Sequence, residues 1–452
     1  MECYLGIILR FCKGPFMYIK ERKRSNLLMQ KTSTIEFIMM IGILLAAMNF
    51  INRYYFCVFI AFFVFLTVPG RRLKIDISFI ILMLLSASML IFDKESLVNF
   101  NAAFKPFVFP LCYIWGRSFI KKEATYEEHT KKISVVAFIL ALGCLIHFTL
   151  NYIINQGADD RNTIDFWTGM VMSATGQATI ACISIGVAVA YLFSEVNWKK
   201  KLFAVVTLII VVLYNLILSG RTIIAFTLIL VAFAYLFRMF VAKKGRFRTI
   251  VVLILAAFLL YWLYNQNIFG IKEAFEDSLL YDRFFAKNSA YDLHEDTRAG
   301  AKAYYLKHMW EYPFGGEHLH KIYGGRAHDL YFDTHDAGGI IAFISVCVYS
   351  LITISRAVQV VRCKALDFNT KQLLICFYII LHMQFWTEPI LAGLPWTFAS
   401  FCLIDGFVAT VLEKHKDETQ VVSKFVRDKK ARMEKINGYN YRNKIKNPIS
   451  MD

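Results

Sequence analysis

Charged residues are scarce in this chain. They make up only 19% of its 452 residues, whereas 57% of the residues are hydrophobic, and the mean hydropathy is +0.47. A soluble globular protein usually has about 25% charged residues. The composition therefore excludes an ordinary soluble protein and indicates a membrane protein.

Acidic residues are the scarcer of the two charged classes. The chain has 34 Asp and Glu against 51 Lys and Arg, which gives a formal net charge of +17. In a soluble domain this excess would suggest binding to nucleic acid, but here the basic residues gather in short loops between apolar runs. Such a distribution is a signal of membrane topology, so we expect no nucleic-acid partner.

Two other features are missing from the sequence. The 10 cysteines lie mostly inside apolar runs and lack metal-type spacing, so they predict neither a disulfide framework nor a cysteine metal site. A short apolar patch near the N-terminus has no small-residue cleavage site after it, so we do not predict a signal peptide. No repeat relates the two halves of the chain, as it does in many transporters.

Long apolar runs are abundant. Those of about 17 to 25 residues can cross the hydrocarbon core of a bilayer as helices. We place them at residues 35–51, 54–69, 75–92, 102–120, 133–154, 167–193, 202–218, 222–241, 249–264, 337–354, 373–390 and 396–412. The predicted fold is an all-α polytopic membrane protein with about twelve transmembrane helices.

The basic loops alternate along the chain and therefore fall on one face of the membrane. Because positive loops stay in the cytoplasm, both termini of this multi-pass chain are predicted to lie on the cytoplasmic side of the cell membrane. The predicted segments are a basic N-terminus (1–34), helices (35–264), a large extracytoplasmic loop with short helices (265–336), three helices (337–412) and a basic tail (413–452). The tail is expected to be solvated, helical in part and attracted to anionic lipid.

The extracytoplasmic loop is the one long polar interruption, and we expect any chemistry there. Asp296 or Thr297 can cap a helix whose first turn holds Arg298, with Lys302 and Tyr305 on the same face. A cation at a helix start opposes the helix dipole and favours an anionic partner. The alternative is an exposed arginine on a solvated helix, which spacing alone favours.

Two more cations lie at predicted outer helix ends. Arg221 follows a short turn between two spans, and Lys105 precedes a proline at the start of another span. Basic residues are unusual on the translocated side, although side chains that snorkel to the interface explain them equally well. Together with Arg298 they would form a receptive site for a phosphate group on a lipid.

Histidines are concentrated in the same loop. His318, His320, His328 and His335 lie near several aspartates and could form a metal site, but the spacing matches no strict motif, so we do not favour a metal. His328 lies where the chain returns to the membrane and is the candidate general base. Arg326 and His335 join Lys105, Lys302 and Tyr305 as candidate substrate-binding residues.

Polar residues inside the predicted spans are a further class of candidates. His147, Asn215, Gln384 and Asp405 are each costly to place in a bilayer and so count as candidate site residues. A group from Ser173 to Thr179 has the spacing of close helix packing, and it could instead line a polar cavity.

Several motifs in order resemble the O-antigen ligase and O-antigen polymerase superfamily. They are Ser219-Gly220-Arg221-Thr222 between two spans, then in the loop Asp296-Thr297-Arg298, Trp310 with Pro313-Phe314-Gly315-Gly316, Ala327-His328-Asp329-Leu330-Tyr331, and Asp336-Ala337-Gly338-Gly339-Ile340. The resemblance covers about residues 202–354. It matches Arg221, Arg298 and His328 to the family's functional arginines and histidine. Asp329 departs from the asparagine that is common in the family.

The resemblance implies a membrane glycosyltransferase. Its members act on undecaprenyl-diphosphate-linked glycans, and we expect this chain to polymerise oligosaccharide repeat units of an O-antigen, capsule or exopolysaccharide outside the cytoplasm. Such a reaction needs no cofactor and no metal, and a chain-length regulator and a flippase are possible partners. The alternatives are a ligase that hands the finished glycan to another acceptor and, from a different class, a polysaccharide flippase or another twelve-helix transporter.

Overall fold

The computed structural model describes residues 34–68, 73–92, 104–120, 124–155, 162–218, 220–241, 271–276 and 297–446, together with a few residues between 251 and 267. Its first helix is Thr34–Ala47. The remaining elements are η1 (Phe50–Asn52), α2 (Tyr54–Leu66), α3 (Ile77–Phe92), η2 (Lys105–Phe107), α6 (Val108–Phe119), α7 (Tyr126–Ile154), β1 (Asn162–Ile164), β2 (Val171–Ser173), α8 (Ala174–Phe193), α9 (Trp198–Ile217), α10 (Arg221–Val241), α12 (Ile271–Glu276), α14 (Thr297–His308), α15 (His318–Tyr323), α16 (Leu330–Arg362), α17 (Phe368–Phe385), α18 (Ile390–Gly393) and α19 (Pro395–Lys446).

Five described helices are long and apolar enough to cross a membrane: α7, α8, α10, α16 and the part of α19 from Pro395 to Val421. Three shorter apolar helices accompany them, namely Thr34–Ala47, α2 and α3. Large apolar side chains on the outside of the bundle stay exposed, among them Phe63 at 64%, Leu228 at 64% and Leu351 at 67%. Because water would penalise such a surface, it is the surface expected of a helical membrane protein.

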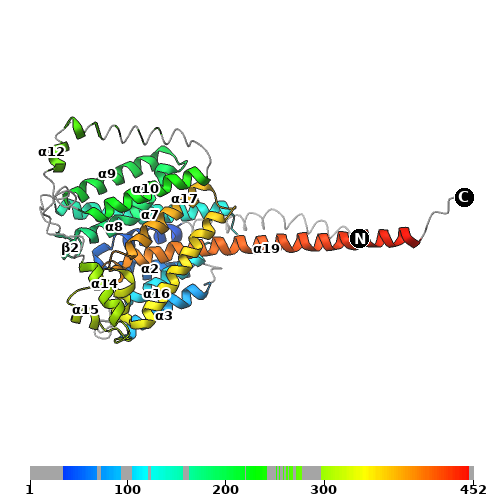
Figure 1. The fold of residues 1–452 in the computed structure, drawn as a ribbon, viewed down its shortest axis with the longest axis horizontal. Coiled ribbons are helices and arrows are strands. Elements are labelled where there is room, and N and C mark those ends of the chain that lie inside the picture. The colour runs from blue at the N-terminus through cyan, green and yellow to red at the C-terminus, as the bar shows by residue number, and fades with distance from the viewer. Residues whose placement is uncertain are drawn as a thin grey trace, which may run out of the picture.

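The helices form one bundle with α8 at its centre, where it packs against α7, α9, α10 and α17 (Figure 1). A second set of contacts joins α6 to α19 and α3 to α16. Glycine permits the closest approach: a Cβ atom at Gly116 would lie 2.0 Å from the Leu403 carbonyl oxygen, and one at Gly406 would lie 2.2 Å from the Tyr113 carbonyl oxygen. Small residues at crossings are the usual means by which helices pack without a hydrophobic driving force.

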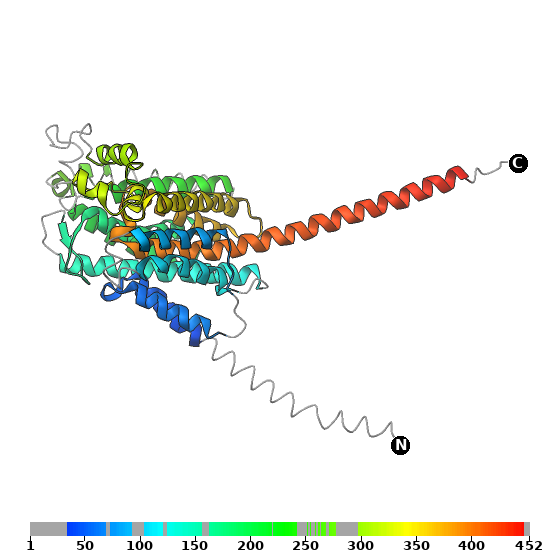
Figure 2. The same cartoon turned by 90° about the horizontal axis from the view of Figure 1, so that it is seen from below.

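The two ends of the bundle differ. The β1–β2 hairpin, α14 and α15 gather at one end, whereas α19 extends far beyond the other end (Figure 2). The first helix starts at the same end from which α19 projects. The small elements that follow α10 along the chain therefore lie opposite the projecting helix.

A network of charged side chains crosses the bundle interior and accounts for the intramembrane Asp405. The Asp405 carboxylate accepts hydrogen bonds from the hydroxyls of Tyr349 at 2.9 Å and Tyr378 at 2.7 Å, and it pairs with Arg356. Arg356 also donates to the Tyr113 hydroxyl at 2.9 Å. A buried charge with this many partners is satisfied, and removal of one partner leaves the other uncompensated.

The predicted boundaries differ from the structure in two places. The helix predicted at 167–193 begins only at Ala174, because residues Asn162–Ser173 form an antiparallel hairpin and Ser173 caps α8 through the Gly176 amide. The helix α16, which contains the span predicted at 337–354, begins at Leu330 and runs through a kink at Gly339. The tail is helical as far as Lys446, as expected in part. The span predicted at 249–264 lies largely outside the described residues.

Candidate functional site

The helices α14 and α15 enclose a small core of their own at the end of the bundle. Tyr305, Met309, Leu319 and Ala327 are its buried members. Tyr305 is 0% exposed, and its hydroxyl donates a hydrogen bond of 3.2 Å to the Gly325 carbonyl oxygen. The side chain predicted to bind substrate therefore holds α14 against the segment that follows α15.

The glycine motifs explain how this unit joins the bundle. Gly315 and Gly339 both have positive φ, 66° and 73°, a conformation that favours glycine. A Cβ atom at Gly339 would lie 2.4 Å from the Pro313 carbonyl oxygen, which instead accepts a 2.8 Å hydrogen bond from the Ile340 amide. The two motifs thus form one contact, which attaches the loop to the kink in α16.

Two aspartates cap the helices of the unit. Asp329 is the N-cap of α16 and accepts from the Phe332 amide at 2.8 Å. Asp336 accepts from the Leu319 and His320 amides at 3.1 and 3.2 Å, so it caps α15. Asp329 therefore acts as a helix cap, because its carboxylate satisfies a free amide at the helix start.

Arg298 and Lys302 reach from α14 to the end of α17. The Arg298 Nη1 atom donates to the Thr387 carbonyl oxygen at 3.3 Å, and the Lys302 Nζ atom donates to the Trp386 carbonyl oxygen at 2.6 Å. Lys302 also lies 3.4 Å from the Asp329 carboxylate. As expected, Arg298 is in the first turn of α14, but there both cations face the negative end of α17, where the helix dipole favours positive charge.

Glu388 is a residue of this site that the sequence analysis did not single out. It is 3% exposed, and its Oε1 atom has no hydrogen-bond partner among the described residues. The Arg298 Nη1 atom is 3.7 Å from that oxygen. Burial raises the pKa of Glu388 to about 7, although Arg298, Thr175 and Lys302 act in the opposite direction. Its signal in the sequence was only an acidic residue near the end of the span predicted at 373–390.

His328 lies among the cations. Its φ of 57° is in the left-handed region, which is uncommon for a residue with a side chain and tends to mark functional positions. Burial lowers the pKa of His328, and the positive charges of Arg298, Arg326 and Lys302 lower it further. The imidazole is therefore neutral at pH 7 and able to accept a proton.

The remaining candidate site residues lie in different parts of the structure. Arg326 lies 3.8 Å from the Glu317 carboxylate. His335 is 0% exposed and stands against the Phe343 ring, so a substrate in the loop does not reach it. Arg221 starts α10 and Lys105 lies in η2, both half-buried. The largest charge effects on the pKa of His328 come from Arg298, Arg326 and Lys302.

The polar residues predicted inside the spans have structural partners. The His147 Nε2 atom is 2.7 Å from the Asp165 carboxylate, which joins α7 to the β-hairpin. The Gln384 amide oxygen accepts from the Thr179 hydroxyl at 3.2 Å, and the Asn215 amide donates to the Val211 carbonyl oxygen at 2.8 Å. These contacts favour the packing interpretation of the sequence.

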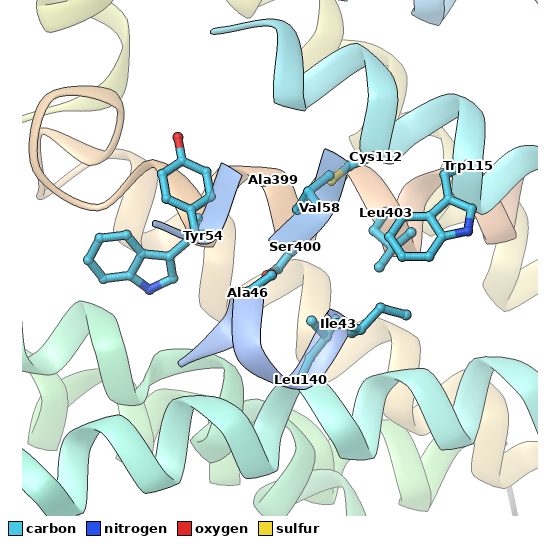
Figure 3. A pocket seen from close by; sticks show the side chains of 11 residues that line it. Ile43, Ala46, Tyr54, Val58, Cys112, Trp115, Leu140, Ala399, Ser400 and Leu403 are labelled. Carbon is cyan, nitrogen blue, oxygen red and sulfur yellow. The ribbon is translucent and has the colours of Figure 1, made fainter. Parts of the chain in front are cut away.

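Within the described part of the chain, no three His, Cys, Asp or Glu side chains come together in a way that could hold a metal ion. A narrow cavity lies between the first helix, α2, α6, α7 and α19 (Figure 3), and its lining is almost wholly apolar. Tyr54 stands at one end of it, with its ring centre 6.1 Å from that of Trp396, and Trp115 stands at the other end.

Comparisons with known proteins give no relative. No family model matches the chain, and no curated protein matches its sequence.

Proposed function

We propose that this chain is a multi-pass membrane glycosyltransferase that polymerises undecaprenyl-diphosphate-linked oligosaccharide repeat units outside the cytoplasm. The observation that carries the proposal is a neutral His328 held beside Arg298, Lys302 and Arg326 at one end of an apolar helix bundle. In this proposal the bundle has about twelve spans with both termini in the cytoplasm, and α14 and α15 are extracytoplasmic.

The cluster suits the chemistry of glycosyl transfer from a diphosphate. The acceptor hydroxyl oxygen bonds to the anomeric carbon, and the bond between that carbon and the diphosphate oxygen breaks. Negative charge grows on the leaving diphosphate, where the Arg298 guanidinium and the Lys302 ammonium stabilise it. His328 takes the proton of the hydroxyl as the new bond forms.

Arg298 and Lys302 are already held in position by the carbonyl oxygens at the end of α17. Preorganised charges of this kind cost little reorganisation when charge develops in the transition state. The bilayer-facing bundle beneath them would hold the polyprenyl chain.

The test uses the full chain in liposomes with a lipid-linked repeat unit as the sole substrate. The native protein should produce a ladder of polymers, and H328A and R298A should reduce it by at least about 100-fold, which is the size of typical effects when a general base is removed. His308, which pairs with Glu311 at 2.9 Å on the surface of the same unit, gives the matched control H308A. A ladder of undiminished yield from H328A and R298A would overturn the proposal, and activity only after addition of a second acceptor would assign the chain to the ligases.

A further inference from the structure

A polar cavity lies at the end of the bundle from which α19 projects, far along the helices from His328. Its volume is about 270 Å³, and its walls come from α7, α8, α9 and α17 and from the turn between α8 and α9. These four helices lie side by side in the bundle (Figure 1). The volume is at the lower end of the range for small-ligand sites and suits a lipid headgroup better than a whole lipid.

One wall of the cavity presents a fixed cation. The Lys200 Nζ atom donates to the Ser134 hydroxyl oxygen at 3.1 Å and lies 5.1 Å from the centre of the Tyr191 ring. The buried Tyr191 hydroxyl lies beside the same Ser134 hydroxyl. A held ammonium beside two hydroxyl groups favours an oxyanion such as a phosphate.

The cavity is also lined by an acidic residue. Glu195 lies in the turn between α8 and α9 and lines the same cavity as Lys200. The amide of Asn369, at the start of α17, fixes this turn: its oxygen accepts from the Glu195 amide at 2.8 Å and its nitrogen donates to the Glu195 carbonyl oxygen at 3.1 Å. The cavity therefore has one basic and one acidic residue in its lining.

We propose that this cavity binds a zwitterionic phosphoethanolamine group, with the phosphate at Lys200 and the primary ammonium at Glu195. A purely anionic headgroup would leave its negative charge facing the Glu195 carboxylate. Lys200 lies in the first turn of α9, a helix of 20 residues, whose dipole adds positive charge where the phosphate binds. The site does not depend on the proposed glycosyl transfer.

The test measures binding to the full-length protein by native mass spectrometry from detergent. Phosphatidylethanolamine, phosphatidylglycerol and phosphatidylcholine are titrated separately, and free phosphoethanolamine is a fourth ligand. One phosphatidylethanolamine should bind more tightly than either other lipid. K200Q should weaken it about tenfold, while E195Q should weaken it a few-fold and leave phosphatidylglycerol unchanged, since exposed charges contribute less than held ones.

Lys199 provides the matched control, because it is an exposed lysine in the same turn that does not line the cavity. K199Q should bind phosphatidylethanolamine like the native protein. If free phosphoethanolamine displaces the lipid at equal concentration, the natural ligand is the soluble compound. If it does not, the natural ligand is the headgroup of a lipid. Equal binding of all three lipids, or binding that K200Q and K199Q reduce alike, would overturn the proposal.

Discussion

The titration of Glu388 offers the sharpest test of the site, because two opposing effects meet at one carboxyl group. Burial favours the neutral acid, whereas Arg298, 3.7 Å away, favours the carboxylate. Two unit charges at that distance attract by roughly 4 kcal/mol at an effective dielectric constant of about 20, which would lower the pKa by about 3 units if it acted alone. The pKa is nevertheless raised to about 7 because burial is the larger effect.

We therefore expect the Glu388 carboxyl to lose its proton near pH 7. Infrared difference spectra between the native protein and E388Q, recorded from pH 5 to pH 9, isolate the stretch of this one protonated acid. The band should be present at pH 5 and half lost near pH 7. In R298Q, where the neighbouring positive charge is gone, the midpoint should rise by about 1 to 3 units, since the partly exposed guanidinium is screened.

The same shift has a consequence for stability. A carboxyl whose pKa is raised from 4.5 to about 7 contributes stability that is complete below pH 4.5 and is lost as the pH rises through 7. The difference amounts to roughly 3 kcal/mol at 1.36 kcal/mol per unit. E388Q should match the native protein near pH 4.5 and be more stable above pH 7. A native midpoint at or below pH 4.5 would show that the ion pair prevails over burial and would refute the reasoning.

Four further predictions test other parts of the structure. R298K keeps the charge but loses the guanidinium fork, so polymer yield from liposomes should fall at least about tenfold. With saturating substrate, the activity of the native protein should stay level above pH 6.5 and decline below it, as His328 with its lowered pKa becomes protonated. A rate that instead increases toward pH 5 would contradict this role. G339A places a Cβ atom 2.4 Å from a carbonyl oxygen at positive φ, which should cost about 1–3 kcal/mol and speed protease cleavage around α14 and α15. D405N should destabilise the bundle by about 3–5 kcal/mol, seen as a lower melting temperature, because buried Arg356 then keeps only the more distant Asp76 carboxylate, at 3.8 Å.

The helical class and the polar unit after α10 could be predicted from the sequence, because both depend on the length of apolar runs. The boundaries of individual helices and strands could not be predicted in the same way. Val171 and Met172 are as apolar as the helix they precede, so periodicity alone does not separate β2 from α8. The start of α16 was placed too late for a related reason: residues Leu330–Asp336 include polar side chains that are typical of loops, yet they are buried against α14 and α15.

The candidate site was predicted in part. The spacing of Arg298 and Lys302 indicated one helix face, and the structure brings both to the end of α17. Tyr305 shares their side of the helix but is buried, and a helical spacing gives no way to tell a packed tyrosine from an exposed one. Glu388 was missed because its neighbours come from α14, some 90 residues earlier in the chain, and only the folded structure brings them together.

The carboxylates beside Arg298 and Lys302 determine the net positive charge of the site. Arg298 and Lys302 each have a carboxylate within 4 Å, Glu388 for the first at 3.7 Å and Asp329 for the second at 3.4 Å. Because the pKa of Glu388 is about 7, about half of the molecules at neutral pH have an Arg298 whose charge Glu388 does not offset. An arriving diphosphate is attracted by that charge and, once bound, raises the affinity of Glu388 for its proton, since a second negative charge nearby disfavours the carboxylate. Binding of the lipid should therefore take up a proton above pH 7, and the affinity should fall as the pH increases, a dependence that E388Q should abolish while leaving the two contacts with the end of α17 in place.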